Sequence, residues 1–142
     1  MDRKTIIDLI GNTELLCLKN ETTGITQNIF VKTEYMNPSG STKDRIALYM
    51  IKSAEKENKL QPGGMIVEAS TGNTAIALCF VGCALGYRVK IFLPKEVAED
   101  EKISIMKLYG GEVEKVETGY KSQSKDCKVH GSKIEIIPRQ KC

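Results

Sequence analysis

The chain has 142 residues, of which 41% are hydrophobic and 27% are charged, and its formal net charge at pH 7 is +3. This length suits one domain with a proper hydrophobic core, and the composition is that of an ordinary globular protein. So small a net charge, carried by acidic and basic residues that are interspersed along the chain, argues against a protein that binds nucleic acid.

The cysteines and the apolar segments narrow the class of protein further. The five cysteines are Cys17, Cys79, Cys83, Cys127 and Cys142. An odd number without a Cys-x-x-Cys pair favours small buried side chains over a disulfide framework or a metal site. The sequence shows neither the apolar core of a signal peptide nor an apolar run long enough to cross a membrane. We therefore expect a cytoplasmic protein that contacts no membrane and binds no metal.

The pattern of apolar residues predicts short strands that alternate with helices. Strands are expected, in chain order, over residues 15–18, 29–35, 65–69, 88–93 and 112–116. Helices are expected over residues 4–10, 42–58, 75–85 and 98–109, and a polar loop over residues 20–27. From residue 65 onward the order is a βαβαβ unit, whose right-handed crossovers make the strands parallel. The predicted fold class is therefore α/β, with a parallel sheet covered by helices.

The end of the chain differs from the rest. Residues 1–118 carry the strand and helix patterns, whereas residues 119–142 have no helical period. Within this last segment only Ile134, Ile136 and Ile137 suggest a short strand. We therefore expect a structured region followed by a divergent tail, for which disorder is an open alternative.

The segment Asn37-Pro38-Ser39-Gly40-Ser41-Thr42-Lys43-Asp44-Arg45, here called the lysine turn, begins with turn dipeptides and runs into a helix. Ser41 and Asp44 have the spacing of a capping box, which places Lys43 in the first helical turn. The helix N-terminus is partially positive, so it disfavours a cation there, and in a dry site both effects favour the neutral amine. A neutral lysine forms a Schiff base with a carbonyl compound. The alternative interpretation is an ordinary solvated lysine.

A second junction, Ser70-Thr71-Gly72-Asn73-Thr74, follows the strand expected over residues 65–69 and is called the polar turn. In parallel sheets ligands gather at the carboxyl ends of the strands. Hydroxyls, an amide and the free N–H groups of a helix N-terminus make the polar turn a cradle for a carboxylate or phosphate. Simple helix capping is the alternative. A nucleotide-binding P-loop is a weaker interpretation, because the Gly-x-x-x-x-Gly-Lys spacing is absent.

Together, Ile10-Gly11-Asn12-Thr13, the lysine turn and the polar turn resemble the cysteine synthase (O-acetylserine sulfhydrylase) family of fold type II pyridoxal-phosphate enzymes. The resemblance implies that Lys43 holds pyridoxal 5′-phosphate as a Schiff base and later moves the Cα proton. It also implies that the polar turn binds the carboxylate of an amino-acid substrate, and that Asn73 reaches the cofactor as well. The residues concerned are Ser70, Thr71, Gly72, Asn73 and Thr74.

The reaction implied by the resemblance is β-replacement, in which an activated serine such as O-acetylserine reacts with sulfide to give cysteine. The family also implies a homodimer. The family's glycine-rich loop for the cofactor phosphate lies further along a full-length chain, and we expect these 142 residues to lack it. The alternative function is therefore a truncated, non-catalytic family member that cannot hold pyridoxal phosphate properly. An enzyme similar to cystathionine β-synthase is a weaker alternative.

Three departures from the family pattern are mild. Glu14 stands where proline is usual, Ala75 stands where glycine is usual, and Ser70-Thr71 reverses the usual order of the two residues. The number of hydroxyl groups in the polar turn is unchanged by that reversal. The resemblance therefore continues from the N-terminus to about Glu117.

Overall fold

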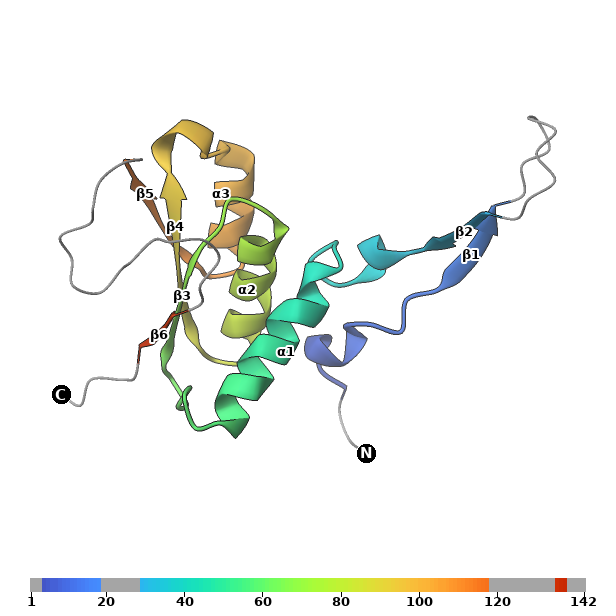
Figure 1. Ribbon diagram of the computed structural model, residues 1–142, viewed down its shortest axis with the longest axis horizontal. Coiled ribbons are helices and arrows are strands. Elements are labelled where there is room, and N and C mark those ends of the chain that lie inside the picture. The colour runs from blue at the N-terminus through green and yellow to red at the C-terminus, as the bar shows by residue number, and fades with distance from the viewer. Residues whose placement is uncertain (1–3, 19–28, 118–134, 138–142) are drawn as a thin grey trace.

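A computed structural model of the protein describes residues 4–18, 29–117 and 135–137 (Figure 1). The polar loop expected over residues 20–27 and most of the tail lie outside the described residues. The described strands form a four-stranded sheet and a separate two-stranded hairpin. The fold is α/β, as the sequence predicts.

The larger sheet has the strand order β5-β4-β3-β6. The strands are β3 (Met65–Ala69), β4 (Arg88–Pro94), β5 (Glu112–Val116) and β6 (Glu135–Ile137). The first three are mutually parallel, in the order in which they follow along the chain. β6 supplies the strand expected from the isoleucines of the tail, and it pairs antiparallel with the free edge of β3. The sheet is thus parallel except for one edge strand.

Three helices lie on one side of this sheet (Figure 1): α1 (Lys43–Lys56), α2 (Asn73–Ala84) and α3 (Asp100–Leu108). α2 packs on β3 and β4, and α1 packs on the outer side of α2. α2 is buried around most of its circumference, as expected for a helix that is apolar on nearly every side. The core therefore lies between the sheet and α1, with α2 in the middle.

Close packing of α2 on the sheet depends on Gly82. A Cβ atom at this position would lie 2.6 Å from Cγ2 of Val89 and 3.2 Å from Cδ1 of Ile66. Both side chains belong to the fully buried part of the core, with 1% of each exposed. Because no methyl group stands between them, α2 approaches β3 and β4 more closely than a helix with alanine at this position would.

The hairpin of β1 (Leu15–Leu18) and β2 (Ile29–Lys32) projects away from the helices and the sheet (Figure 1). All residues of these two strands are exposed. Cross-strand pairing places four apolar side chains on one face, namely Leu16, Leu18, Ile29 and Val31. None of the described helices is long and apolar enough to span a membrane.

Several predicted bounds differ from the structure. β2 ends three residues before the predicted end, because Glu34–Met36 form a short 3-10 helix, η2, closed by a 2.7 Å hydrogen bond from the Asn37 side-chain amide to the Glu34 carbonyl. α3 starts later than predicted because a 3-10 turn, η3 (Lys95–Val97), precedes it. The N-terminal helix is also of the 3-10 type, η1 (Ile6–Leu9), and α1 ends at Lys56.

Candidate active site

α1 begins at Lys43, so this lysine lies in the first helical turn, as predicted. The chain reverses just before it through a 2.7 Å hydrogen bond from the Gly40 N–H to the Asn37 carbonyl, and Gly40 has a φ of +87°. The Ser41 hydroxyl accepts a hydrogen bond of 3.2 Å from the Lys43 N–H. The lysine turn therefore fixes where α1 begins.

The prediction of a capping box between Ser41 and Asp44 is wrong, because Asp44 pairs with Ser39. Asp44 is fully buried, and its carboxylate accepts hydrogen bonds from the Ser39 N–H at 2.8 Å and from the Ser39 hydroxyl. The reversal at Gly40 brings the Ser39 N–H, rather than that of Ser41, in front of the carboxylate. Asp44 still places a negative group in the first turn of α1, where the helix dipole favours it.

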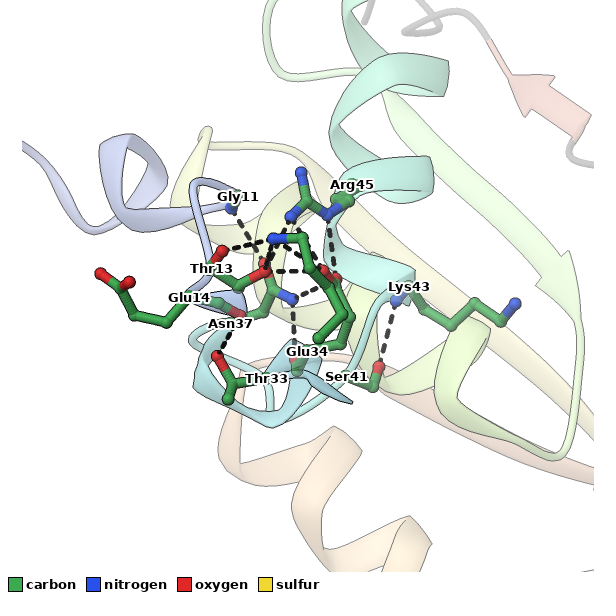
Figure 2. A network of polar contacts seen from close by, with 10 residues as sticks. Gly11, Thr13, Glu14, Thr33, Glu34, Asn37, Ser41, Lys43 and Arg45 are labelled. Carbon is green, nitrogen blue, oxygen red and sulfur yellow. Dashed lines mark hydrogen bonds and ion pairs between the residues drawn. The ribbon is translucent and has the colours of Figure 1, made fainter. Parts of the chain in front are cut away.

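The Lys43 side chain is half-buried and extends away from the polar contacts on the other side of α1 (Figure 2). Among the described residues, Nζ of Lys43 has neither a hydrogen-bond partner nor an ion-pair partner. A lysine amine in this position is open to a ligand.

The polar turn leads into α2, whose N-cap residue is Gly72. No side chain of the described residues caps this helix, so the interpretation of the polar turn as a simple cap is not supported. Within the part of the chain that the structure describes, the N–H groups of Asn73 and Thr74 have no acceptor. A Cβ atom on Gly72 would meet no other atom within 4 Å. The start of α2 therefore presents free donors beside open space, as an anion site requires.

The two turns lie at the same end of the molecule. α1 and α2 pack against each other, and both begin at the end where β3 finishes (Figure 1). Two residues of the polar turn are exposed, Thr71 and Asn73, and the other three are half-buried. The structure thus brings the amine of Lys43 and the free donors of α2 to one edge of the fold.

A polar network on the other side of α1 was not predicted from the sequence. The Glu34 carboxylate accepts hydrogen bonds from Arg45 Nε at 2.9 Å and Arg45 Nη2 at 3.0 Å, from the Thr13 hydroxyl at 2.7 Å and from Asn37 Nδ2 at 2.9 Å (Figure 2). These hydrogen bonds, that of Arg45 first, lower the pKa of Glu34 to about 2. Three of the four residues belong to the motifs identified above, but Glu34 falls in a predicted strand.

Glu68 is a second residue that sequence reasoning missed. It lies in β3, two residues before the polar turn, and only 2% of it is exposed. Its Oε1 atom has no hydrogen-bond partner among the described residues, and burial raises the pKa of the carboxyl group. Glu68 shares a face of β3 with Ile66, which packs toward α2, so its side chain is on the helix side of the sheet. The sequence signal that could have identified Glu68 is a charged residue within an otherwise apolar strand.

Residues 6–135 match the family model described as pyridoxal-phosphate dependent enzyme, so the chain belongs to that family. It is 43% identical over 108 residues to a cysteine synthase of Staphylococcus aureus, an alignment that covers 76% of this chain and 34% of the relative. Cystathionine beta-synthase of Saccharomyces cerevisiae is 41% identical over 114 residues, covering 78% of this chain and 22% of that protein.

A solved structure supports the same assignment. The crystal structure of a hydrogen sulfide-producing enzyme from Fusobacterium nucleatum is 42% identical to this chain, with a TM-score of 0.77 over 84% of this chain and 39% of that one. The family resemblance and the fold expected from the sequence are therefore confirmed. The chain spans about a third of the length of the cysteine synthase that it matches.

The donors at the two turns suit the cofactor of this family. Lys43 offers an amine without a partner for the aldehyde group, and α2 offers two free N–H groups for an anionic group. Gly72 leaves open space beside them. The described residues thus fit the part of the cofactor and substrate that carries the reacting atoms.

Proposed function

We propose that this chain forms the lysine-bearing part of a cysteine synthase active site, which uses pyridoxal 5′-phosphate to replace the β-substituent of O-acetylserine or a similar serine derivative with sulfide. The observation that carries this proposal is the placement, at one end of the molecule, of a lysine amine without a partner and a helix N-terminus without a cap. The similarity to a named cysteine synthase supports the choice of reaction.

Lys43 is the proposed catalytic residue. Pyridoxal phosphate, when bound, supplies an electron sink that makes the Cα proton of an amino acid acidic and eases the loss of its β-substituent. Nζ of Lys43 would hold the cofactor and would then take and return the Cα proton. Among the described residues, no hydrogen-bond or ion-pair partner competes for this amine.

The polar turn is the proposed site for the substrate carboxylate. The free N–H groups of Asn73 and Thr74 and the hydroxyls of Ser70 and Thr71 are the donors, and the positive end of the α2 dipole adds to the attraction. Gly72 lets the substrate approach the backbone, because no Cβ atom occupies the space in front of it. The amide of Asn73 is also proposed to contact the cofactor.

The proposed active unit contains more protein than the described residues. The exposed apolar faces of the β1–β2 hairpin favour contact with further protein, in agreement with the homodimer expected from the family. We assign residues 1–118 to the N-terminal part of the enzyme and residues 119–142 to a divergent tail. The similarity to a cystathionine beta-synthase makes that reaction the second candidate.

The decisive experiment is chemical trapping. Purified protein is incubated with pyridoxal phosphate and then treated with borohydride, and the modified lysine is located by peptide mass. We expect a stoichiometric adduct on Lys43, its loss in Lys43→Arg, and its retention in the control Lys52→Arg, since Lys52 is paired with Glu55 on the same helix. Labelling scattered over many lysines, or none at all, would replace the proposal with the non-catalytic alternative.

An adduct on Lys43 leads to a second assay. O-acetylserine and sulfide are added to the loaded protein and cysteine is measured, with homocysteine in place of sulfide as the test for the second candidate. Formation of cystathionine instead of cysteine would favour that second candidate.

A further inference from the structure

The geometry points to Glu34 as a positioning residue that aims Lys43, acting through Arg45 and Asn37. This inference rests on the proposed role of Lys43. Glu34 lies outside the lysine turn and the polar turn. Its partner Arg45 projects from the side of α1 opposite Lys43 (Figure 2). A set of hydrogen bonds holds the lysine turn from both of its ends.

The first set of hydrogen bonds fixes the start of α1. Arg45 Nε and Nη2 reach the two oxygens of Glu34 at 2.9 and 3.0 Å, which is a bidentate pair of fixed orientation. A helix turns by about 100° per residue, so residues two apart project to roughly opposite sides. Figure 2 shows Lys43 and Arg45 doing so. Fixing the guanidinium of Arg45 therefore fixes the rotation of the first turn of α1, and with it the direction of Lys43.

The second set of hydrogen bonds fixes Asn37, the first residue of the lysine turn. Asn37 is 2% exposed, and its Nδ2 donates to the carbonyl of Glu34 at 2.7 Å and to Glu34 Oε2 at 2.9 Å. Its Oδ1 accepts a hydrogen bond of 2.9 Å from the Gly11 N–H. One glutamate thus sets both where the lysine turn starts and how the helix after it is rotated.

The Glu34 carboxylate makes more hydrogen bonds, with more partners, than an ordinary surface ion pair. Such pairs contribute little when they are exposed and singly bonded. Here both carboxylate oxygens are shared among Arg45, Thr13 and Asn37. Gly11 has a φ of +88°, and a Cβ atom on it would lie 2.9 Å from Arg45 Nη1, so this backbone approaches the guanidinium directly. The packing leaves Arg45 little freedom to turn.

The test compares two glutamates by the rate at which Lys43 is labelled. Glu34→Gln removes the charge and one side of the bidentate pair. Glu55→Gln is the control, since the Glu55 carboxylate also accepts side-chain hydrogen bonds, from Lys52 and Tyr87, but lies on α1 about three turns from Lys43. Each variant is incubated with pyridoxal phosphate, trapped with borohydride at set times and digested, and its unfolding midpoint in urea is measured separately.

We expect Glu34→Gln to slow labelling of Lys43 by about ten- to a hundred-fold relative to the other lysines, the size of effect that a misplaced reacting group produces. Glu55→Gln should leave that ratio unchanged even if it lowers stability as much. Arg45→Lys keeps the positive charge but cannot form the bidentate pair with Glu34, and it should slow labelling of Lys43 as well. This third variant serves as the test if Glu34→Gln does not fold.

Each other outcome refutes a distinct statement. Wild-type protein that shows no preference for Lys43 would overturn the proposed function and this inference together. Normal labelling of Lys43 in folded Glu34→Gln or Arg45→Lys would overturn the positioning role alone. Equal slowing in Glu55→Gln would also overturn it, because the effect would then follow stability and not the direction of the lysine.

Discussion

Replacing Glu68 with glutamine is expected to stabilise the folded protein at neutral pH and to change its stability little in acid. The reason is that Glu68 is 2% exposed and that, in the part of the chain that the structure describes, its Oε1 has no hydrogen-bond partner. Burial raises the pKa of Glu68 above its ordinary value of 4.5, because the charged form is poorly solvated inside the protein. Glutamine has the same shape and carries no charge.

The sign follows from proton binding. Since the folded state has the higher pKa, it keeps this proton over a range of pH in which the unfolded chain has already lost it. The free energy of unfolding therefore falls as pH rises above 4.5 toward the folded pKa. Below 4.5 both states are protonated, and this contribution is constant. Stability due to Glu68 is thus fully present in acid and is lost toward neutrality.

The magnitude follows from the burial of one unsatisfied group. Leaving a buried polar group without a partner costs about 1–3 kcal/mol, and a charged one costs more. The amide of glutamine can keep the backbone hydrogen bond from Ala69, but the atom in place of Oε1 still lacks a partner among the described residues and retains part of that cost. We therefore expect Glu68→Gln to raise the free energy of unfolding near neutral pH by about 1–2 kcal/mol, or several degrees in Tm.

Urea unfolding followed by circular dichroism measures this difference below pH 4.5 and near neutrality. The control is Glu101→Gln, which changes an exposed carboxylate on α3. A gain that grows with pH in Glu68→Gln alone supports the reasoning. A difference independent of pH, or a loss of stability near neutrality, would refute it, since the carboxyl group would then have a partner that keeps it charged.

Gly82→Ala should lower the free energy of unfolding by about 1–3 kcal/mol, because its methyl group would meet Val89 Cγ2 at 2.6 Å, and a lower urea midpoint with unchanged slope checks this. The pKa of Glu34 is held at about 2, so its contribution to stability is present above its ordinary value of 4.5 and is lost as pH falls toward 2; acid unfolding should show a shallower slope in Glu34→Gln. Cys17 is exposed, whereas burial raises the pKa of the Cys79 thiol to about 12, so an aromatic disulfide reagent should label Cys17 in native protein and Cys79 only after unfolding.

The bounds of β1, β3 and β5 could be predicted from the sequence because glycines and polar residues flank each of these short segments. Lys43 could be placed in the first turn of α1 for the same reason, since Pro38 and Gly40 prevent the helix from starting earlier. These predictions depend only on residues close together along the chain. They succeed where local preference and the final fold agree.

The predictions that failed, or were not made, depend on contacts between distant residues. Thr13 is 21 residues from Glu34 and 32 residues from Arg45 in the sequence, so no local pattern indicates that the three meet. The same contacts end β2 early, because Glu34 turns toward Asn37 instead of continuing the strand. Asp44 accepts a hydrogen bond from Ser39 instead of the predicted Ser41, because a capping pattern does not specify how the chain reverses at Gly40.

The strand order also has a consequence for how the chain acquires its structure. β3, β4 and β5 pair in the order in which they are synthesised, and each connection is short and contains one α-helix, so this part forms from contacts close in sequence. Such contacts close small loops and form quickly. β6 reaches the edge of β3 only after the whole parallel unit has been made. We therefore expect the parallel unit to be protected from hydrogen exchange early in refolding, and the edge pairing with β6 to be protected last.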